Sequence, residues 1–259
     1  PQAMSGTARL SRRRLLATAA GAAAAWAASC LTAPLAFAER FFAEPVWRRK
    51  KPYWGFGVDI DKCIGCARCV DACKTENDVP RKPFYFRTWV ERYVIRKTGE
   101  IQVESPNGGL DGYTQLRDKE DVSKTFFVPK LCNLCENSPC IQVCPVGATF
   151  KTEEGVVLID RKYCIGCRYC IQACPYGTRY FHPTLKVADK CSLCYHRIMK
   201  GLNPACVEVC PTGARIFGDM SEPDSPISRF IEANHVQVLK PHMGTKPKTV
   251  YKGLEREVR

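Results

Sequence analysis

The cysteines offer the clearest chemistry in this sequence, because 16 of the 17 lie in four compact groups. The groups are Cys63, Cys66, Cys69 and Cys73; Cys132, Cys135, Cys140 and Cys144; Cys164, Cys167, Cys170 and Cys174; and Cys191, Cys194, Cys206 and Cys210. Disulfides explain this arrangement poorly, since crowded C-x2-C pairs leave few bridges of acceptable geometry. Thiolates are the ligands that zinc and iron–sulfur centres use in proteins. The sequence therefore predicts metal centres.

The first and third groups have the spacing C-x2-C-x2-C-x3-C, which is typical of the bacterial ferredoxin run. In that run three cysteines hold one 4Fe-4S cluster, and the fourth reaches a neighbouring cluster. We expect the fourth cysteine to begin a helix, because proline follows it in the last three groups and suits a first helical turn. Zinc is the competing interpretation, but zinc ligands usually form two pairs separated by a longer gap. Three cysteines at unbroken two-residue intervals favour iron–sulfur clusters.

Short apolar runs and an internal repeat indicate the elements that must carry these groups. Residues 57–60 and 156–159 predict strands before the first and third groups, and residues 70–76 predict a short helix. The second and fourth groups both open Cys-x-Leu-Cys and close Val-Cys-Pro, which is typical of one unit used twice. The aromatic run 84–90 and the Gly-rich turn 106–109 predict a hairpin. The predicted fold class is α+β, with two ferredoxin-like βαβ cluster-binding domains, a β-hairpin insertion and a C-terminal extension.

The charge of the chain fits buried anionic clusters. The 259 residues carry 39 basic and 26 acidic side chains, a net charge of +13, and 45% of the residues are apolar, which excludes a disordered chain. Each oxidised cluster with four thiolates contributes a charge of about −2, so four clusters would offset most of the basic excess. We therefore expect no nucleic-acid partner. We also expect folding to depend on cluster insertion.

Residues 1–38 have the composition of an export signal. They contain no acidic residue, and arginines at positions 12–14 precede the Ala-rich apolar stretch 15–38. Two arginines directly before an apolar pair are typical of a twin-arginine signal peptide, and Ala36-Phe37-Ala38 fits signal peptidase cleavage. The sequence predicts a periplasmic protein that is exported folded. The stretch is also long enough to remain as an uncleaved membrane anchor, and lipid attachment at Cys30 is a further alternative.

With these features, the sequence resembles the four-cluster iron–sulfur subunits of respiratory oxidoreductases, which serve dimethyl sulfoxide, polysulfide, thiosulfate, tetrathionate and nitrite reductases. The resemblance covers about residues 55–251 and includes the 16 grouped cysteines, CKTENDVP at 73–80 and GTKPK at 244–248. Within the family, residues 86–93 and 105–109 behind a twin-arginine leader are most similar to the periplasmic iron–sulfur subunit of the sulfite-reductase-associated (Dsr) membrane complex.

The resemblance implies a nested pairing of the groups, whereas the internal repeat alone would pair the first group with the second. Cluster 1 is then held by Cys63, Cys66, Cys69 and Cys210, cluster 2 by Cys191, Cys194, Cys206 and Cys73, cluster 3 by Cys132, Cys135, Cys140 and Cys174, and cluster 4 by Cys164, Cys167, Cys170 and Cys144. The implied domains are residues 39–79 with 186–224 for clusters 1 and 2, an insertion 80–125, residues 126–185 for clusters 3 and 4, and a tail 225–259. The tail itself predicts a helix at 227–233 and a strand at 236–239.

No residue cluster suggests substrate chemistry, since the four histidines are scattered at positions 182, 196, 235 and 242. We therefore expect a non-catalytic electron-transfer subunit with four 4Fe-4S clusters. The resemblance implies that it relays single electrons between a polytopic membrane quinone-interacting subunit and a multihaem cytochrome c or a molybdopterin catalytic subunit. These partners would hold it at the outer face of the cytoplasmic membrane. The alternatives are an iron–sulfur subunit of a molybdopterin oxidoreductase, a self-sufficient reductase, and a structural metal-binding module.

Overall fold

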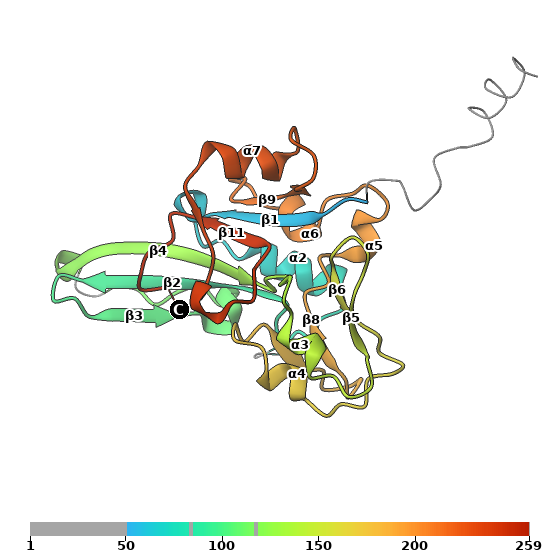
Figure 1. Ribbon diagram of the computed structural model, residues 1–259. Helices are drawn as coiled ribbons and strands as arrows, with labels where there is room; N and C mark the ends of the chain where they lie inside the picture. Colours follow the sequence, from blue (N-terminus) through green and yellow to red (C-terminus); the bar gives the residue numbers. More distant parts are fainter. Residues whose placement is uncertain (1–50, 83–84, 117–118, 259) are drawn as a thin grey trace, which may run out of the picture. The chain divides into compact units, whose positions relative to one another are not determined.

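The structure is a computed structural model that describes residues 51–82, 85–116 and 119–258 (Figure 1). The predicted signal peptide, its alternative as a membrane anchor, and Cys30 all lie outside these residues. In the described part of the chain, helix α2 (Arg68–Glu76) is the longest helix, with nine residues. None of the helices described there has the length and apolar composition that crossing a membrane requires.

A four-stranded sheet brings the two ends of the described chain together (Figure 1). Its order is β10 (Val236–Gln237), β11 (Thr249–Lys252), β1 (Trp54–Asp59) and β9 (Arg215–Asp219). β1 pairs parallel with β11 and antiparallel with β9, so that Phe56 lies opposite both Thr249 and Phe217. The strand predicted at 57–60 therefore begins earlier, at Trp54. Neighbours on both edges explain why all its residues after Trp54 are buried.

Helix α7 (Pro226–Ala233) covers this sheet at β9 and β1. Ser225 begins the helix as its N-cap, since its hydroxyl accepts a hydrogen bond from the Ser228 amide at 3.2 Å. The helix packs so closely that a Cβ at Gly57 would lie 2.8 Å from the Phe230 ring. The tail helix predicted at 227–233 is thus confirmed. The strand predicted at 236–239 forms β10 but ends at Gln237.

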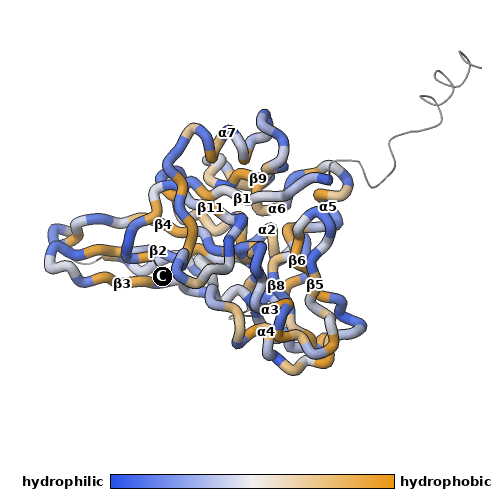
Figure 2. The backbone as a smooth tube through the Cα atoms, viewed as in Figure 1, coloured by the Kyte–Doolittle hydropathy of each residue, from blue (hydrophilic) through white to orange (hydrophobic). Residues whose placement is uncertain are grey.

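The predicted hairpin is a three-stranded antiparallel sheet in the order β3 (Ile101–Glu104), β2 (Thr88–Arg96) and β4 (Val122–Leu131). Its register runs from Thr88 opposite Leu131 to Ile95 opposite Lys124. Apolar and polar stretches alternate along it (Figure 2). Position 84 of the predicted aromatic run lies outside the described residues. In the described part, 85–90, strand pairing starts at Thr88, and the Tyr85 carbonyl instead accepts a hydrogen bond from Lys74 Nζ at 2.9 Å.

Short elements carry the remaining cysteine groups. Two antiparallel pairs are formed by β5 (Thr149–Lys151) with β6 (Val157–Ile159) and by β7 (Arg179–Phe181) with β8 (Ala188–Lys190). Single helical turns form α3 (Pro139–Gln142), α4 (Tyr169–Gln172), α5 (Tyr195–Ile198) and α6 (Ala205–Glu208). 3-10 turns lie at Ile60–Lys62, Pro106–Gly109, Lys119–Asp121 and Pro241–Met243. This mixture of helices and small sheets is an α+β fold.

Several cysteines are buried in the apolar core. Its buried side chains include Phe56, Val58, Leu131, Leu134, Leu193 and Tyr251, and Cys69, Cys132, Cys191 and Cys206 lie among them. Free thiols pack as small apolar groups. The interior that joins the sheets is therefore also the wall of the cysteine sites.

Candidate iron–sulfur centres

The third cysteine of every group occupies the same place, the second residue of a short helix. These residues are Cys69 in α2, Cys140 in α3, Cys170 in α4 and Cys206 in α6. Our expectation that the fourth cysteine begins a helix is wrong. Cys144, Cys174 and Cys210 lie two residues beyond a helix, and each carbonyl accepts a hydrogen bond from the glycine amide three residues on, at 3.3–3.4 Å. The proline after each cysteine therefore occupies a turn.

The residue two positions after each first cysteine has a left-handed backbone. These residues are Gly65, Leu134, Gly166 and Leu193, with φ of 70°, 47°, 70° and 57°. The Leu193 amide donates a hydrogen bond to Cys191 Sγ at 3.4 Å. The amides of Gly65 and Leu134 make the same contact with the first cysteines of their own groups. Burial nevertheless raises the pKa of Cys63 to about 11 against the Gly65 amide, whereas for Cys132 the Lys190 charge and the Leu134 amide outweigh burial and lower the pKa. Amide donors directed at sulfur favour its negative, metal-binding form.

Replacement of Gly166 by alanine tests this loop geometry. A Cβ at Gly166 would lie 2.7 Å from the Lys186 carbonyl oxygen, which is backbone and cannot turn away. Any alanine at a left-handed position strains the backbone and lowers the free energy of unfolding. We expect the clash at Gly166→Ala to lower it by about 1–3 kcal/mol more. Gly177→Ala is the matched control, because Gly177 has a similar φ of 63° and nothing within 4 Å of its Cβ position. Equal denaturation midpoints for the two holoproteins would contradict the prediction.

Three cavities of similar size are each lined by four cysteines from two different groups. Their empty volumes, including space open to solvent, are about 330, 300 and 320 Å3. Cavity 1 is lined by Cys63, Cys66, Cys69 and Cys210, cavity 2 by Cys73, Cys191, Cys194 and Cys206, and cavity 3 by Cys132, Cys135, Cys140 and Cys174. The remaining four of the 16 grouped cysteines line none of these three cavities. Of these, Cys167 is exposed, Cys170 is buried, and Cys144 and Cys164 are half-buried.

The chemistry of these cavities fits a cluster better than a single ion. A zinc ion draws four sulfurs to about 2.3 Å from one point. Within the described residues, no three His, Cys, Asp or Glu side chains gather closely enough to hold one ion. Burial raises the pKa of the Cys73 thiol well above its usual value, and the neighbouring Cys191 and Cys206 raise it further. Four thiolates can share such a site only with several positive charges among them, which the irons of a 4Fe-4S cluster supply.

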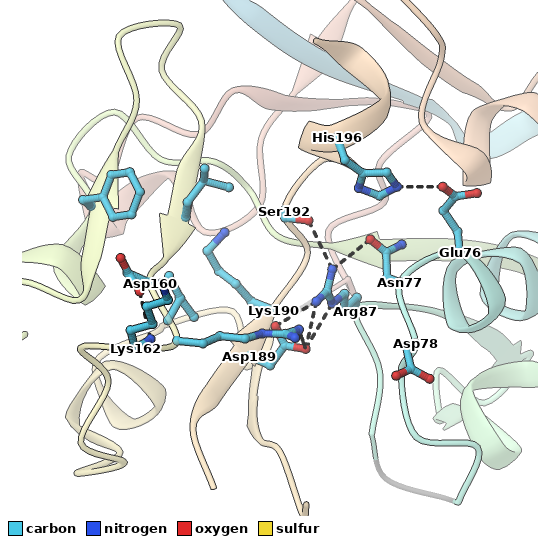
Figure 3. A pocket seen from close by; sticks show the side chains of 14 residues that line it. Glu76, Asn77, Asp78, Arg87, Asp160, Lys162, Asp189, Lys190, Ser192 and His196 are labelled. Atoms are coloured by element: carbon cyan, nitrogen blue, oxygen red, sulfur yellow. Dashed lines mark hydrogen bonds and ion pairs between the residues drawn. The ribbon is translucent and has the colours of Figure 1, made fainter. Parts of the chain in front are cut away.

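Arg87 fixes the polar wall of cavity 2, and Figure 3 shows its polar partners as seen from the neighbouring open pocket, which Arg87 also lines. Its guanidinium forms a buried ion pair with Asp189 of β8 at 3.0 Å and donates a hydrogen bond to Asn77 Oδ1 at 2.9 Å. The Asn77 amide nitrogen in turn lies 3.7 Å from Cys73 Sγ and 3.5 Å from Cys194 Sγ. One amide thus contacts sulfurs that are 121 residues apart. Arg87 holds this contact between α2 and the fourth cysteine group.

Sequence reasoning assigned no role to Asn77, Arg87, Arg179 or Arg215. For two of them a signal was present, since Arg179 and Arg215 each end a repeated Cys-Pro-x-Gly-x-Arg pattern at 174–179 and 210–215. Arg87 has no local signal, because Asp189 is 102 residues away.

Known proteins match these features over most of the described residues. Two family models, each described as a 4Fe-4S dicluster domain, match residues 62–148 and 123–220. A tetrathionate reductase subunit of Archaeoglobus fulgidus is 48% identical over 197 residues, which cover 76% of this chain and 80% of the relative. A polysulfide reductase chain of Wolinella succinogenes is 37% identical over 196 residues, covering 75% and 91%. The Hdr-like menaquinol oxidoreductase iron-sulfur subunit 1 of Archaeoglobus fulgidus is 34% identical over 290 aligned positions, covering 96% and 100%.

The two domain matches together account for about four 4Fe-4S clusters. Relatives found in the comparison are named as subunits or chains of reductases. The chain therefore belongs to the family of 4Fe-4S dicluster iron–sulfur subunits of reductase complexes, and it is an electron-transfer subunit with no catalytic activity of its own.

Proposed function

We propose that the chain holds four 4Fe-4S clusters in nested ligand sets and relays single electrons along them. The four cysteines that line each of cavities 1, 2 and 3 would hold one cluster per cavity. Cys164, Cys167, Cys170 and Cys144 would hold the fourth cluster. The observation that carries the proposal is that each of the three cavities is lined by four cysteines drawn from two groups. When bound, the clusters supply reversible one-electron redox chemistry.

The contacts between the sites support a continuous order from cluster 1 through cluster 2 to cluster 3. Arg215 lines cavity 1 and donates a hydrogen bond to Thr88, which lines cavity 2. Leu131 lines cavity 2, and the next residue, Cys132, lines cavity 3. Neighbouring walls of this kind leave little protein between one site and the next. The residues between the sites therefore set the distances between neighbouring clusters and exclude water from the space between them.

Replacing Cys73 tests the nested sets. We expect Cys73→Ala and Cys194→Ala to lose the same cluster, because both cysteines line cavity 2. Iron and acid-labile sulfide content and the electron paramagnetic resonance spectrum of the reduced protein measure the loss. Cys66→Ala is the matched control, since Cys66 is in the first group beside Cys73 yet lines cavity 1. Identical spectra for Cys73→Ala and Cys66→Ala, distinct from Cys194→Ala, would refute the nested sets.

For the complex, we propose a polytopic quinone-interacting membrane subunit on one side of the path and a multihaem cytochrome c or molybdopterin subunit on the other. The relative named as a menaquinol oxidoreductase iron–sulfur subunit supports the quinone partner. The twin-arginine pattern of residues 12–16 supports export in the folded state. In the proposed complex these partners attach the exported chain to the outer face of the cytoplasmic membrane. Copurification from detergent-solubilised membranes tests this arrangement. Recovery of the full-length chain alone, from the cytoplasm, would contradict it.

A further inference from the structure

Two buried arginines occupy equivalent places in the two halves of the chain. Arg179 and Arg215 lie five residues after Cys174 and Cys210, and they are the first residues of β7 and β9. Arg179 is 5% exposed and Arg215 is 3% exposed. In both repeats, therefore, a positively charged arginine lies in the interior shortly after the fourth cysteine of the third or fourth group.

Each arginine is fixed by a threonine at the start of another strand. Arg215 Nη2 donates a hydrogen bond to Thr88 Oγ1 at 2.8 Å, and Thr88 is the first residue of β2. Arg179 Nη1 donates to Thr149 Oγ1 at 3.4 Å, and Thr149 is the first residue of β5. The same arginine–threonine contact thus recurs in both halves. Such repetition indicates a shared role in the two sites.

Neither arginine has a carboxylate partner among the described residues, in contrast to Arg87 with Asp189. Arg215 Nη1 is buried and has no hydrogen-bond acceptor in the described part of the chain. A buried charge without a partner costs several kcal/mol. The countercharge must therefore come from the cysteine sites that surround the guanidinium.

The sulfurs near each arginine belong to two sites. Arg215 lines cavity 1, and Arg179 lines cavity 3. Burial by itself lowers the pKa of Arg215, yet Cys69 and Cys63 of cavity 1 and Cys206 and Cys73 of cavity 2 raise it overall. For Arg179, burial again lowers the pKa, while Cys140 and Cys132 of cavity 3 and Cys170 of the third group raise it overall. The contacts agree: Thr88, which Arg215 contacts, lines cavity 2, and Thr149, which Arg179 contacts, hydrogen-bonds to the sulfur of Cys144.

We propose that Arg215 and Arg179 are buried countercharges, each shared by the two clusters of one half, and that each raises the reduction potential of both its clusters. The assignment rests on the ligand sets proposed above. A fixed positive charge favours the reduced cluster, because reduction adds a negative charge beside it. Arg215 acts on clusters 1 and 2, and Arg179 acts on clusters 3 and 4. Electron entry into each pair thus depends on one guanidinium.

Potentiometric titration of the full-length, cluster-loaded protein, followed by electron paramagnetic resonance, tests the assignment. We expect Arg215→Met to lower the potentials of two clusters so that their reduced-to-oxidised ratio at a fixed potential falls at least about tenfold, which is 59 mV for a one-electron couple. The other two clusters keep their potentials. Arg179→Met gives the reciprocal pattern, so each variant is the control for the other. Arg215→Lys keeps the charge and therefore most of the original potential.

Each outcome decides the proposal. If Arg215→Met loses clusters 1 and 2 during isolation and Arg215→Lys retains them, the charge is required to hold them, which supports the assignment. If Lys fails as Met does, shape and not charge is the requirement, and the assignment is overturned. Unchanged potentials, or equal shifts in all four clusters, overturn it as well. Iron and sulfide content, which tests the ligand sets, is measured on the same samples and separates a failure of those sets from a failure of this inference.

Discussion

Removal of iron is expected to unfold the described part of the chain. Chelation under reducing conditions takes away the groups around which Cys69, Cys132, Cys191 and Cys206 pack in the core. The elements left behind are weak, since single-turn helices and two-stranded sheets are marginal in water without tertiary packing. Metal binding in proteins of this kind supplies folding free energy directly. The free energy that the bound clusters contribute to folding can therefore exceed the roughly 5–15 kcal/mol by which a domain is ordinarily stable.

Far-ultraviolet circular dichroism and limited proteolysis measure this loss. We expect helix and sheet signals to collapse together with the iron absorbance, and protease sites to open throughout residues 54–252. Anaerobic reconstitution with iron and sulfide should restore both signals, which controls for damage by the chelator. An iron-free protein with an unchanged cooperative thermal transition would show that the apolar core suffices without clusters.

The next largest effect is expected from breaking the buried ion pair of Arg87 with Asp189. The side chains of both residues are 7% exposed, and the Tyr180 hydroxyl also donates a hydrogen bond to Asp189 at 2.6 Å. Arg87→Met leaves the buried Asp189 carboxylate with only the half-exposed Arg161, at 3.9 Å, as a cation, and the loss of its close partner costs up to about 3–5 kcal/mol. It also frees Asn77 from its contact with Arg87. We therefore expect cluster 2 to be lost first as denaturant is added.

Denaturant titration of the holoprotein, with electron paramagnetic resonance to identify the cluster, measures this effect. Arg81→Met is the matched control, because Arg81 forms an ion pair with Asp71 in which both side chains are more than half exposed. Exposed pairs of this kind contribute about 0–1 kcal/mol. A variant Arg87→Met with Asp189→Leu removes both charges and should recover part of the lost stability. If Arg87→Met and Arg81→Met unfold at the same denaturant concentration, the ion pair does not stabilise cavity 2.

The sequence by itself determined the type of centre and the local loops that form it. Cysteine spacing is a short-range property, because two-residue gaps decide how many sulfurs one loop can direct at one point. The strand before the first group, the hairpin and the tail helix were likewise predicted from residues close together in the chain. Their boundaries differ where a side chain outside the element bonds to the backbone, as at Tyr85, whose carbonyl accepts a hydrogen bond from Lys74 Nζ.

No pattern within the chain itself indicated which groups lie around one cavity, since the nested sets came from the family resemblance. The tertiary structure decided which cysteines and which polar residues line each cavity. The internal repeat alone favoured the first group with the second, whereas cavities 1 and 2 combine the first group with the fourth. The pairing of β1 with β9 brings those groups together across more than 150 residues. Likewise Arg87 meets Asp189, and Arg215 meets Thr88, over more than 100 residues. Local spacing cannot encode such contacts, because they depend on strand pairing and on the burial of charges that come within reach of one another only in the folded protein.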